Sequence, residues 1–132
     1  MNDNDLLRYS RQIMLPELDI AGQQRLAKAK VLVVGLGGLG SPLALYLASS
    51  GVGELVLVDD DHVDESNLQR QIAHTEASIG TNKAESAAAR IQEINTNTKL
   101  TSITHRLNRA ELTALLETVH LAFDATDNLA SR

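Results

Sequence analysis

A glycine-rich segment carries the clearest chemical signal in the chain. Residues 35–40 read Gly-Leu-Gly-Gly-Leu-Gly and directly follow the apolar, mostly β-branched run 31–34. Glycines permit a sharp turn and a close approach of the backbone to a ligand, and a helix that begins there adds the partial positive charge of its N-terminus. Ser41 is expected to cap this helix, with Pro42 at its first position. The glycines expected to contact the ligand are Gly35, Gly37, Gly38 and Gly40.

The order strand, glycines, helix favours a nucleotide phosphate as the ligand, with a purely structural turn as the alternative. A carboxylate follows the next predicted strand, because Asp59 lies 19 residues after Gly40. An acidic side chain at this point is well placed to accept hydrogen bonds from ribose hydroxyls. Asp60 and Asp61 follow it, and three adjacent like charges are costly unless a cation or hydroxyl donors balance them. We therefore include Asp61 with Asp59 in the predicted nucleotide site.

Several cationic side chains lie at positions where they could bind an anion. Arg70 lies in a long irregular connection, 61–80, where a helical turn would aim it the same way as Asn67. Lys83 lies in the first turn of a helix predicted to begin at Gly80-Thr81, where a cation opposes the helix dipole unless an anion binds nearby. Arg11 lies on the polar face of the first predicted helix. Each of these residues could instead be a solvated surface charge.

Alternating strands and helices must position these residues. Two helices are expected first, one capped by Asn4 and ended by Pro16, and one capped by Asp19. The predicted strands are 30–34, 54–58, 99–104 and 121–124. Such alternation predicts an α/β fold with a Rossmann-like, doubly wound, mainly parallel sheet in the order 3-2-1-4. Residues 1–29 would form an N-terminal helical arm, and residues 30–132 an incomplete Rossmann-like ATP-binding domain.

This topology brings one more carboxylate to the phosphates. Strands one and four would be neighbours, so Asp127, just after the fourth strand, would lie near the glycine segment. A carboxylate there repels phosphates unless Mg²⁺ lies between them, and Mg²⁺ favours one or two carboxylates together with phosphate oxygens. Asp127 is therefore the predicted metal ligand. One nucleotide, one metal carboxylate and several cations favour ATP chemistry over hydride transfer.

Composition narrows the classes of function. The 132 residues suit one domain, and the net charge of −5, without a basic run or an aromatic stripe, argues against nucleic acid as a partner. No segment approaches the length of a membrane span, and the polar N-terminus reads unlike a signal peptide. Without cysteine there is no disulfide framework, cysteine-ligated zinc or thiol nucleophile in this stretch. The four histidines share no ligand spacing. We expect a cytoplasmic protein.

Five segments occur in a specific order along the whole chain. They are Arg8-Tyr9-Ser10-Arg11-Gln12-Ile13, the glycine segment 35–40, Ser66-Asn67-Leu68-Gln69-Arg70-Gln71, Gly80 through Lys83, and Asp124 through Asn128. Together they resemble the MoeB/ThiF family, the bacterial relatives of ubiquitin-activating enzymes. The resemblance implies an adenylyltransferase that uses ATP to activate the C-terminal glycine of a small ubiquitin-like sulfur-carrier protein of the MoaD or ThiS type. It leaves open whether molybdopterin or thiamine biosynthesis is served.

The resemblance also implies roles for individual residues. ATP contacts are implied for Gly38, Asp59, Ser66, Asn67, Leu68, Gln69, Arg70, Lys83, Asp127 and Asn128. It assigns Asp127 to Mg²⁺ and lets Arg11 reach the site of the partner subunit in a homodimer. The implied catalytic residues are Arg11, Arg70, Lys83 and Asp127. Family members are longer, and a structural zinc on paired Cys-x-x-Cys motifs and much of the carrier-docking surface are expected only in that later part.

Two other functions stay open at this point. An NAD-binding dehydrogenase domain fits the glycine segment and Asp59 equally well, but it does not explain Arg70, Lys83 or Asp127. A non-catalytic nucleotide-binding dimerisation module fits a chain that lacks the carrier-docking part. The sequence leaves open whether the 132 residues alone bind ATP or are active.

Overall fold

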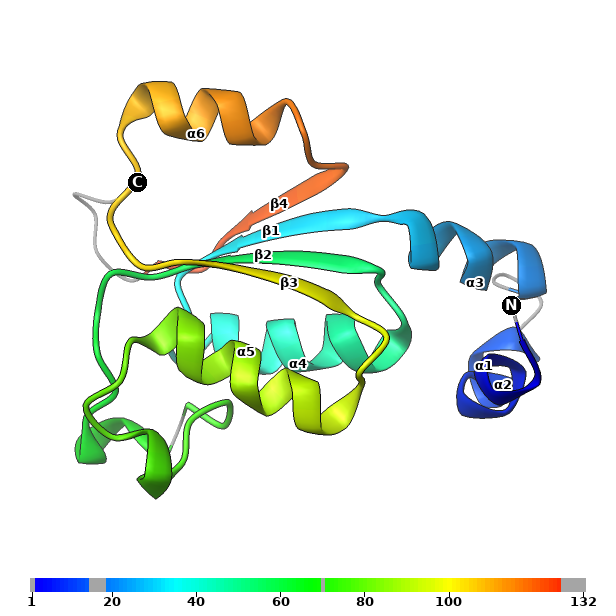
Figure 1. Cartoon of the computed structure of the whole chain (residues 1–132), viewed down its shortest axis with the longest axis horizontal. Coiled ribbons are helices and arrows are strands. Elements are labelled where there is room, and N and C mark those ends of the chain that lie inside the picture. The colour runs from blue at the N-terminus through cyan, green and yellow to red at the C-terminus, as the bar shows by residue number, and fades with distance from the viewer. Residues whose placement is uncertain (1, 15–18, 70, 127–132) are drawn as a thin grey trace.

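The computed structural model describes residues 2–14, 19–69 and 71–126, without the side chain of Ile13. Three helices come first, and strands and helices then alternate (Figure 1). The helices are α1 Asp3–Arg8, α2 Ser10–Ile13, α3 Asp19–Lys28, α4 Gly40–Ser50, α5 Lys83–Ile94 and α6 Arg109–Leu116, with 3₁₀ turns η1 Glu65–Asn67 and η2 Glu76–Ser78. The strands are β1 Lys30–Val34, β2 Glu54–Val58, β3 Lys99–Ile103 and β4 Leu121–Asp124. None of the helices in these ranges is long and apolar enough to span a membrane.

The strands form one parallel sheet in the order β3-β2-β1-β4, which confirms the predicted α/β topology. Val34, at the end of β1, pairs with Val58 of β2 and with Asp124 of β4. The carboxyl ends of three strands therefore meet at one edge. In a doubly wound sheet this edge, beside the point where the strand order reverses, is where ligands bind.

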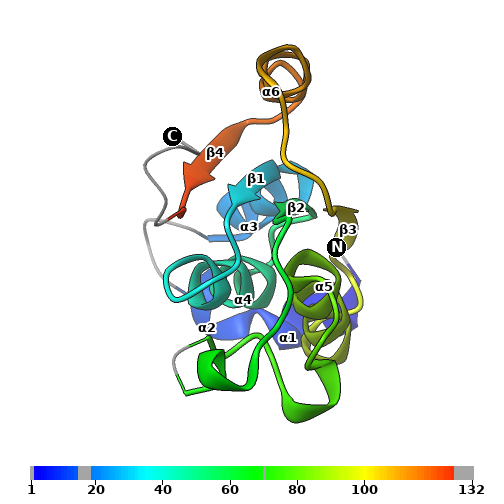
Figure 2. The same ribbon diagram turned by 90° about the vertical axis from the view of Figure 1, so that its left-hand side faces the viewer.

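Helices cover both faces of the sheet, α4 and α5 on one side and α6 on the other (Figure 2). Because side chains alternate along a strand, Val31 and Val33 pack toward α4 and α5, whereas Leu32 packs toward α6. A parallel sheet covered on both faces explains why its central strands are continuously apolar.

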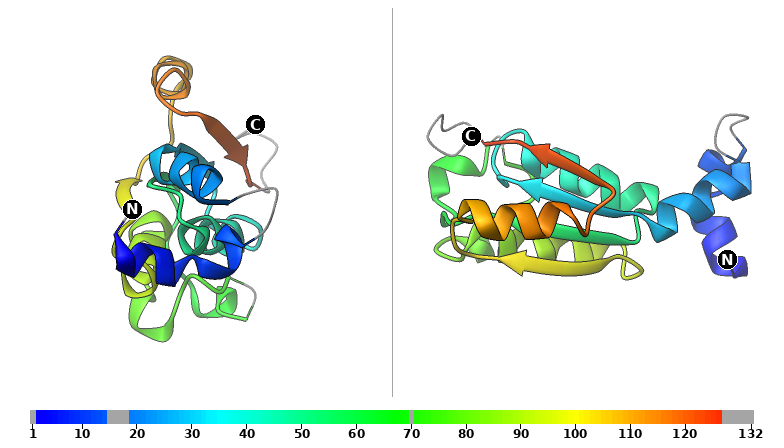
Figure 3. Two further views of the ribbon diagram at one scale, coloured as in Figure 1. Left: turned by 90° about the vertical axis from the view of Figure 1, so that its right-hand side faces the viewer. Right: turned by 90° about the horizontal axis from the view of Figure 1, so that it is seen from above.

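The N-terminal helices group at the end of the sheet where the strands begin (Figure 3). The prediction of one helix from Asn4 to Pro16 was wrong, because α1 and α2 are separated at Tyr9. The Tyr9 side chain is buried, and its hydroxyl accepts a 2.8 Å hydrogen bond from Asn95 Nδ2. Tertiary packing of this side chain thus overrides the local helical pattern. There are therefore three helices before the sheet instead of the two predicted.

The caps of these helices were predicted in part. Asn2, instead of Asn4, caps α1 by accepting from the Asp5 N–H at 2.8 Å. The Asp19 carboxylate caps α3 as predicted, by accepting from the Ala21 and Gly22 N–H groups. Pro16 lies outside the described residues.

Candidate nucleotide-binding site

A cavity of about 680 Å³ lies at the carboxyl edge of the sheet. It is bounded by the loops after β1 and β2, the start of α5, and the ends of β1 and β4. The predicted site residues among its lining are Gly35, Gly37, Gly38, Asp59, Asp61 and Lys83. The topology therefore brings residues from three separate segments of the sequence to one concave surface.

The loop after β1 is built for close backbone contact. Gly35 has φ +93°, which favours glycine, and its N–H donates to Val58 O at 2.8 Å. A Cβ on Gly40 would lie 1.6 Å from Gly35 O, so no side chain fits there. Gly40 does not line the cavity, and its role is to let α4 start directly against the loop.

The prediction that Ser41 caps α4 was wrong. The helix begins at Gly40, its N-cap is Leu39, and no side chain caps it. Ser41 lies inside the first turn, and its hydroxyl donates to Leu36 O at 2.8 Å. The serine therefore fixes the loop instead of receiving a helix N–H, and the first N–H groups of α4 are left without a side-chain acceptor.

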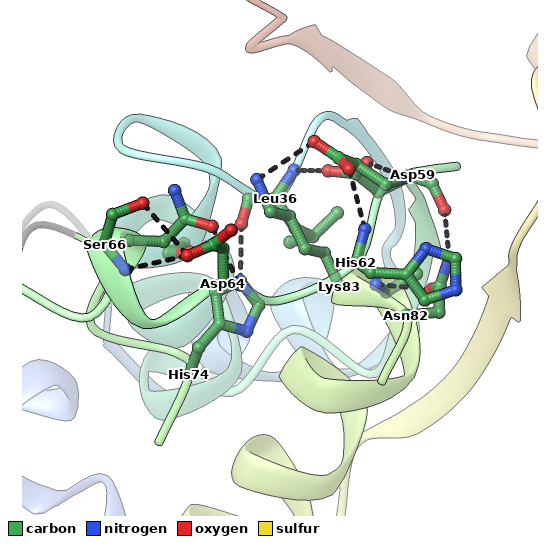
Figure 4. Close-up of polar contacts among 12 residues, drawn as sticks. Leu36, Asp59, His62, Asp64, Ser66, His74, Asn82 and Lys83 are labelled. Atoms are coloured by element: carbon green, nitrogen blue, oxygen red, sulfur yellow. Dashed lines mark hydrogen bonds and ion pairs between the residues drawn. The ribbon is translucent and has the colours of Figure 1, made fainter. Parts of the chain in front are cut away.

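Both polar groups of Leu36 are held by side chains (Figure 4). Its N–H donates to Asp59 Oδ2 at 2.8 Å. Its carbonyl oxygen accepts from Ser41 Oγ and from His74 Nε2, both at 2.8 Å. Leu36 itself is fully buried. The loop is therefore fixed before any ligand arrives.

The end of β2 is tied to the start of α5. Asn82 caps α5 by accepting from the Ala84 and Glu85 N–H groups, and its Nδ2 donates to Asp59 O at 2.7 Å. The helix therefore begins at Lys83, later than the predicted Gly80-Thr81. Sequence reasoning missed this cap, although an asparagine just before an alanine-rich helix is a recognised signal.

Lys83 is placed as predicted, in the first turn of α5 and on the cavity wall. The residue is 7% exposed, and its Nζ lies 3.5 Å from Asp61 Oδ2. Asp59 Oδ1 accepts the Asp61 N–H at 2.9 Å. Asp60 lies 3.9 Å from the Arg106 guanidinium. The three adjacent carboxylates are thus balanced by backbone N–H groups and two cations.

Other predicted site residues lie away from the cavity lining. Ser66, Asn67, Leu68 and Gln69 are in and after η1, and none of them lines the cavity. The Asn67 Oδ1 accepts from the Asp64 N–H at 3.0 Å, which closes a capping box around this turn. Arg70, Asp127 and Asn128 lie outside the described residues.

Arg11 is exposed on α2, at the end of the sheet opposite the cavity (Figure 1). In this chain it does not come near the glycine loop. The structure therefore separates Arg11 from the other predicted site residues of the same chain.

Two residues were missed by the sequence reasoning. Gln71 is 4% exposed, lines the cavity beside Gly37, and its Oε1 has no hydrogen-bond partner within the described ranges. His74 is 5% exposed and hydrogen-bonds Leu36 O and Ser86 Oγ. Burial lowers the pKa of His74, and Lys83 lowers it further, although the bond to Leu36 and the charge of Asp59 act in the opposite direction. The signal that could have indicated them is their position in and just after the segment 66–71.

In residues 2–14, 19–69 and 71–126, no group of three or more histidine, cysteine, aspartate or glutamate side chains could hold a metal ion.

A family model described as the ThiF family matches residues 9–132. The chain belongs to the ThiF family.

Relatives of this ThiF-family chain agree with that assignment. It is 47% identical over 132 residues to the sulfur carrier protein ThiS adenylyltransferase of Escherichia coli K12, covering 100% of this chain and 53% of that protein. It is also 47% identical over 132 residues to the molybdopterin-synthase adenylyltransferase of the same organism, with the same coverage. The ThiF-family chain therefore spans about half the length of these curated relatives.

Solved structures share the ThiF-family fold. The E. coli tRNA N6-threonylcarbamoyladenosine dehydratase TcdA in complex with ATP matches with a TM-score of 0.88 and 30% identity, over 96% of this chain and 52% of that one. E. coli MccB with ATP matches with a TM-score of 0.68 and 32% identity, over 84% of this chain and 33% of that one.

Proposed function

We propose that this chain is the ATP-binding part of an adenylyltransferase that activates the C-terminal glycine of a small ubiquitin-like sulfur-carrier protein. The observation that carries the proposal is the convergence of the glycine loop, Asp59 and Lys83 on one cavity. The adenylyltransferase names of two relatives support the reaction, and the ATP-bound TcdA and MccB structures support the nucleotide.

ATP matches the donors and acceptors of this cavity. The N–H groups of Gly37 and Gly38 donate to no acceptor within the described residues, and they suit phosphate oxygens. Each Asp59 oxygen already accepts one backbone N–H and keeps a further lone pair for a ribose hydroxyl. The Lys83 ammonium pairs with a largely exposed Asp61 carboxylate, and such pairs are weak, so a phosphate can compete for the cation.

We further propose a Mg²⁺ ion near the end of β4. An ideal Cβ on Gly35 would lie 3.0 Å from the backbone of Ala125 and Thr126, so this segment runs directly against the glycine loop. Asp127 follows this segment in the sequence, and we propose that its carboxylate holds Mg²⁺ beside the phosphates. The ion would neutralise charge that develops on the phosphates.

The proposed reaction forms a carboxyl–phosphate bond. The carrier carboxylate attacks the α-phosphorus, the bond to the bridging oxygen breaks, and pyrophosphate leaves. Chemistry of this kind needs positioning and charge neutralisation more than a protein nucleophile. Lys83, Arg70 and the loop N–H groups would supply both.

Arg11 would act in a homodimer. It lies at the far end of the sheet from its own cavity, so a role at the phosphates requires a second subunit. Mixing full-length Arg11→Ala and Asp127→Ala proteins, each inactive alone, should restore part of the activity. If subunits exchange and no activity returns, Arg11 has no role in a shared site.

The proposed function is tested by ATP–pyrophosphate exchange in the full-length protein with a ThiS- or MoaD-type carrier. Exchange should require both Mg²⁺ and the carrier, and Asp127→Ala should abolish it while the protein stays folded. In a thermal-shift assay, ATP with Mg²⁺ should stabilise the protein more than NAD does. Preferential stabilisation by NAD would instead indicate a dehydrogenase domain, and ATP binding without exchange would indicate a non-catalytic module.

A further inference from the structure

The orientation of one peptide group decides which way a loop N–H points. The Leu36 carbonyl is directed into the protein, where Ser41 Oγ and His74 Nε2 donate to it. The chain has no cis peptide bond in the described ranges, so the C=O of Leu36 and the N–H of Gly37 point in opposite directions. Gly37 lines the cavity. Holding the carbonyl inward therefore turns the Gly37 N–H outward, toward the ligand.

The Gly37 N–H is available to a ligand. Within the part of the chain that the structure describes, no hydrogen bond uses it as a donor, although the Gly37 carbonyl accepts from the Ser41 N–H at 2.9 Å. A backbone N–H at a glycine loop before a helix N-terminus is a suitable donor for a phosphate oxygen.

The contacts of His74 define its tautomer. Leu36 O is only an acceptor, so the proton must be on Nε2. Nδ1 is then an acceptor and receives the Ser86 hydroxyl proton at 2.7 Å. His74 thus connects α5, through Ser86, to the loop after β1, and the neutral ring satisfies both partners.

The surroundings of His74 keep the ring neutral. It is buried, and the facing charges are the Lys83 ammonium and the Asp59 carboxylate. Burial and Lys83 lower the pKa of His74 more than its bond to Leu36 and Asp59 raise it. Nδ1 is therefore unprotonated at neutral pH and accepts from the Ser86 hydroxyl, while Nε2 keeps the proton that it donates to Leu36 O.

We propose that His74 is a positioning residue for phosphate binding, which holds the Leu36 carbonyl so that the Gly37 N–H faces the phosphates of the nucleotide. This inference rests on the proposed function, because it assigns the cavity to a nucleotide. It concerns only the phosphate part of that ligand, so adenosine serves as an internal control.

Two substitutions at His74 test the roles of its Nε2 and Nδ1 atoms separately. The Gln side chain places an amide N–H near the position of the histidine Nε2, so His74→Gln keeps a donor for Leu36 O. The shorter Asn side chain reaches only the position of Nδ1, so His74→Asn keeps a polar group near Ser86 and loses the donor to Leu36. Dissociation constants for ATP with Mg²⁺ and for adenosine would be measured by calorimetry on the full-length protein.

His74→Asn should weaken ATP binding about tenfold, the effect of one lost hydrogen bond at a charged ligand, while adenosine affinity stays within about twofold. His74→Gln should stay within about threefold of the wild type for both ligands. Equal losses in the two variants, equal losses for ATP and adenosine, or no loss in His74→Asn would each overturn the inference.

A second variant decides the question if His74→Asn does not fold. Ser86→Ala removes the donor that orients the ring and should weaken ATP binding about threefold without changing adenosine affinity. Unchanged ATP affinity in Ser86→Ala would overturn the inference. If the wild type binds adenosine phosphates no better than adenosine, the proposed function itself fails, which is distinct from a failure confined to the His74 variants.

Discussion

More apolar side chains are buried on one face of the sheet than on the other. On the side of α4 and α5, buried residues form a large continuous cluster that includes Leu55, Leu57 and Ile91. On the side of α6, only Leu32, Val56 and Val58 are buried among the described residues, and Leu116 and Leu121 are largely exposed. Figure 2 shows α4 and α5 on one side of the sheet and α6 on the other.

This difference in packing explains which part of the cavity is held in place before a ligand binds. The glycine loop, Asp59 and Lys83 are held by residues that belong to the well-packed side, including Ser41, His74 and Asn82. On the other side, the cavity is bordered by half-buried apolar residues such as Val34, Leu107 and Leu112. The half of the cavity that we propose for the phosphates is thus held by several hydrogen bonds, whereas the apolar half has fewer such constraints.

The largest effect is expected at the start of α4. Gly40→Ala would place a Cβ 1.6 Å from Gly35 O, a backbone atom that cannot move without disrupting the loop. We expect a loss of more than about 4 kcal/mol in the free energy of unfolding, measured by chemical denaturation. Gly38→Ala is the matched control, because nothing lies within 4 Å of its Cβ.

The control separates folding from binding. Gly38→Ala should change stability by less than about 0.5 kcal/mol, yet weaken ATP binding, because its new methyl group points into the proposed phosphate site. If Gly40→Ala and Gly38→Ala were equally stable, the loop would not be fixed by packing against α4.

A pair of core substitutions tests the two faces directly. Ile91→Ala on the packed side should cost about 3–4 kcal/mol of stability, since Ile91 is fully buried in α5. Leu112→Ala on the α6 side should cost about 1 kcal/mol, because Leu112 is only half-buried. Similar losses in urea denaturation would show that the faces contribute equally to stability.

The next effect concerns ligand affinity. Asp59→Ala removes the acceptor of the Leu36 N–H and the proposed ribose contact, so ATP binding should weaken by roughly 30- to 200-fold, or about 2–3 kcal/mol. Asp60→Ala, at the adjacent exposed aspartate, should change affinity by less than about threefold. Free pyrophosphate should lose much less than ATP in Asp59→Ala, and equal losses would indicate general damage to the sheet.

The smallest expected effect is a pH dependence of the free energy of unfolding, which arises from His74. The pKa of His74 lies below its ordinary value of 6.5 in the folded chain, so the unfolded chain takes up a proton first as the pH falls. The stability that the neutral ring contributes is complete above about pH 6.5 and is lost as the pH falls toward the lower pKa of the folded state. The slope of unfolding free energy between pH 7 and pH 5 should be smaller in His74→Gln. An unchanged slope would contradict a buried, neutral His74.

Much of the fold follows from local patterns in the sequence. All four strands were predicted, and their parallel order follows from the alternation of strands and helices. Gly51 ends α4 with φ +103°, and Asn108 caps α6 by accepting from the Glu111 N–H, as is typical of glycine and asparagine at helix ends. Such features depend on residues close together in sequence, so periodicity and capping rules reveal them.

Apart from the Asn82 cap of α5, the main features that were missed depend on contacts made by the folded chain. The break at Tyr9 depends on Asn95, and the role of His74 depends on Leu36, which is 38 residues away. The Ser41 hydroxyl donates to Leu36 O, only five residues back, but this bond depends on how the loop folds and is not visible in a linear pattern. Some predicted residues, such as Asp59 and Lys83, line the cavity, whereas residues 66–69 do not. The side chains that hold the loop in place were not predicted.

The Leu36 and Gly37 amides, neighbours in the chain, should differ sharply in hydrogen exchange. The Leu36 N–H is donated to Asp59 and lies in a buried residue, so its deuterium uptake requires the loop to open. The Gly37 N–H faces the cavity, where solvent reaches it until a ligand accepts its hydrogen bond. The ratio of the two exchange rates is thus a built-in reporter of site occupancy, readable without a label or a catalytic assay.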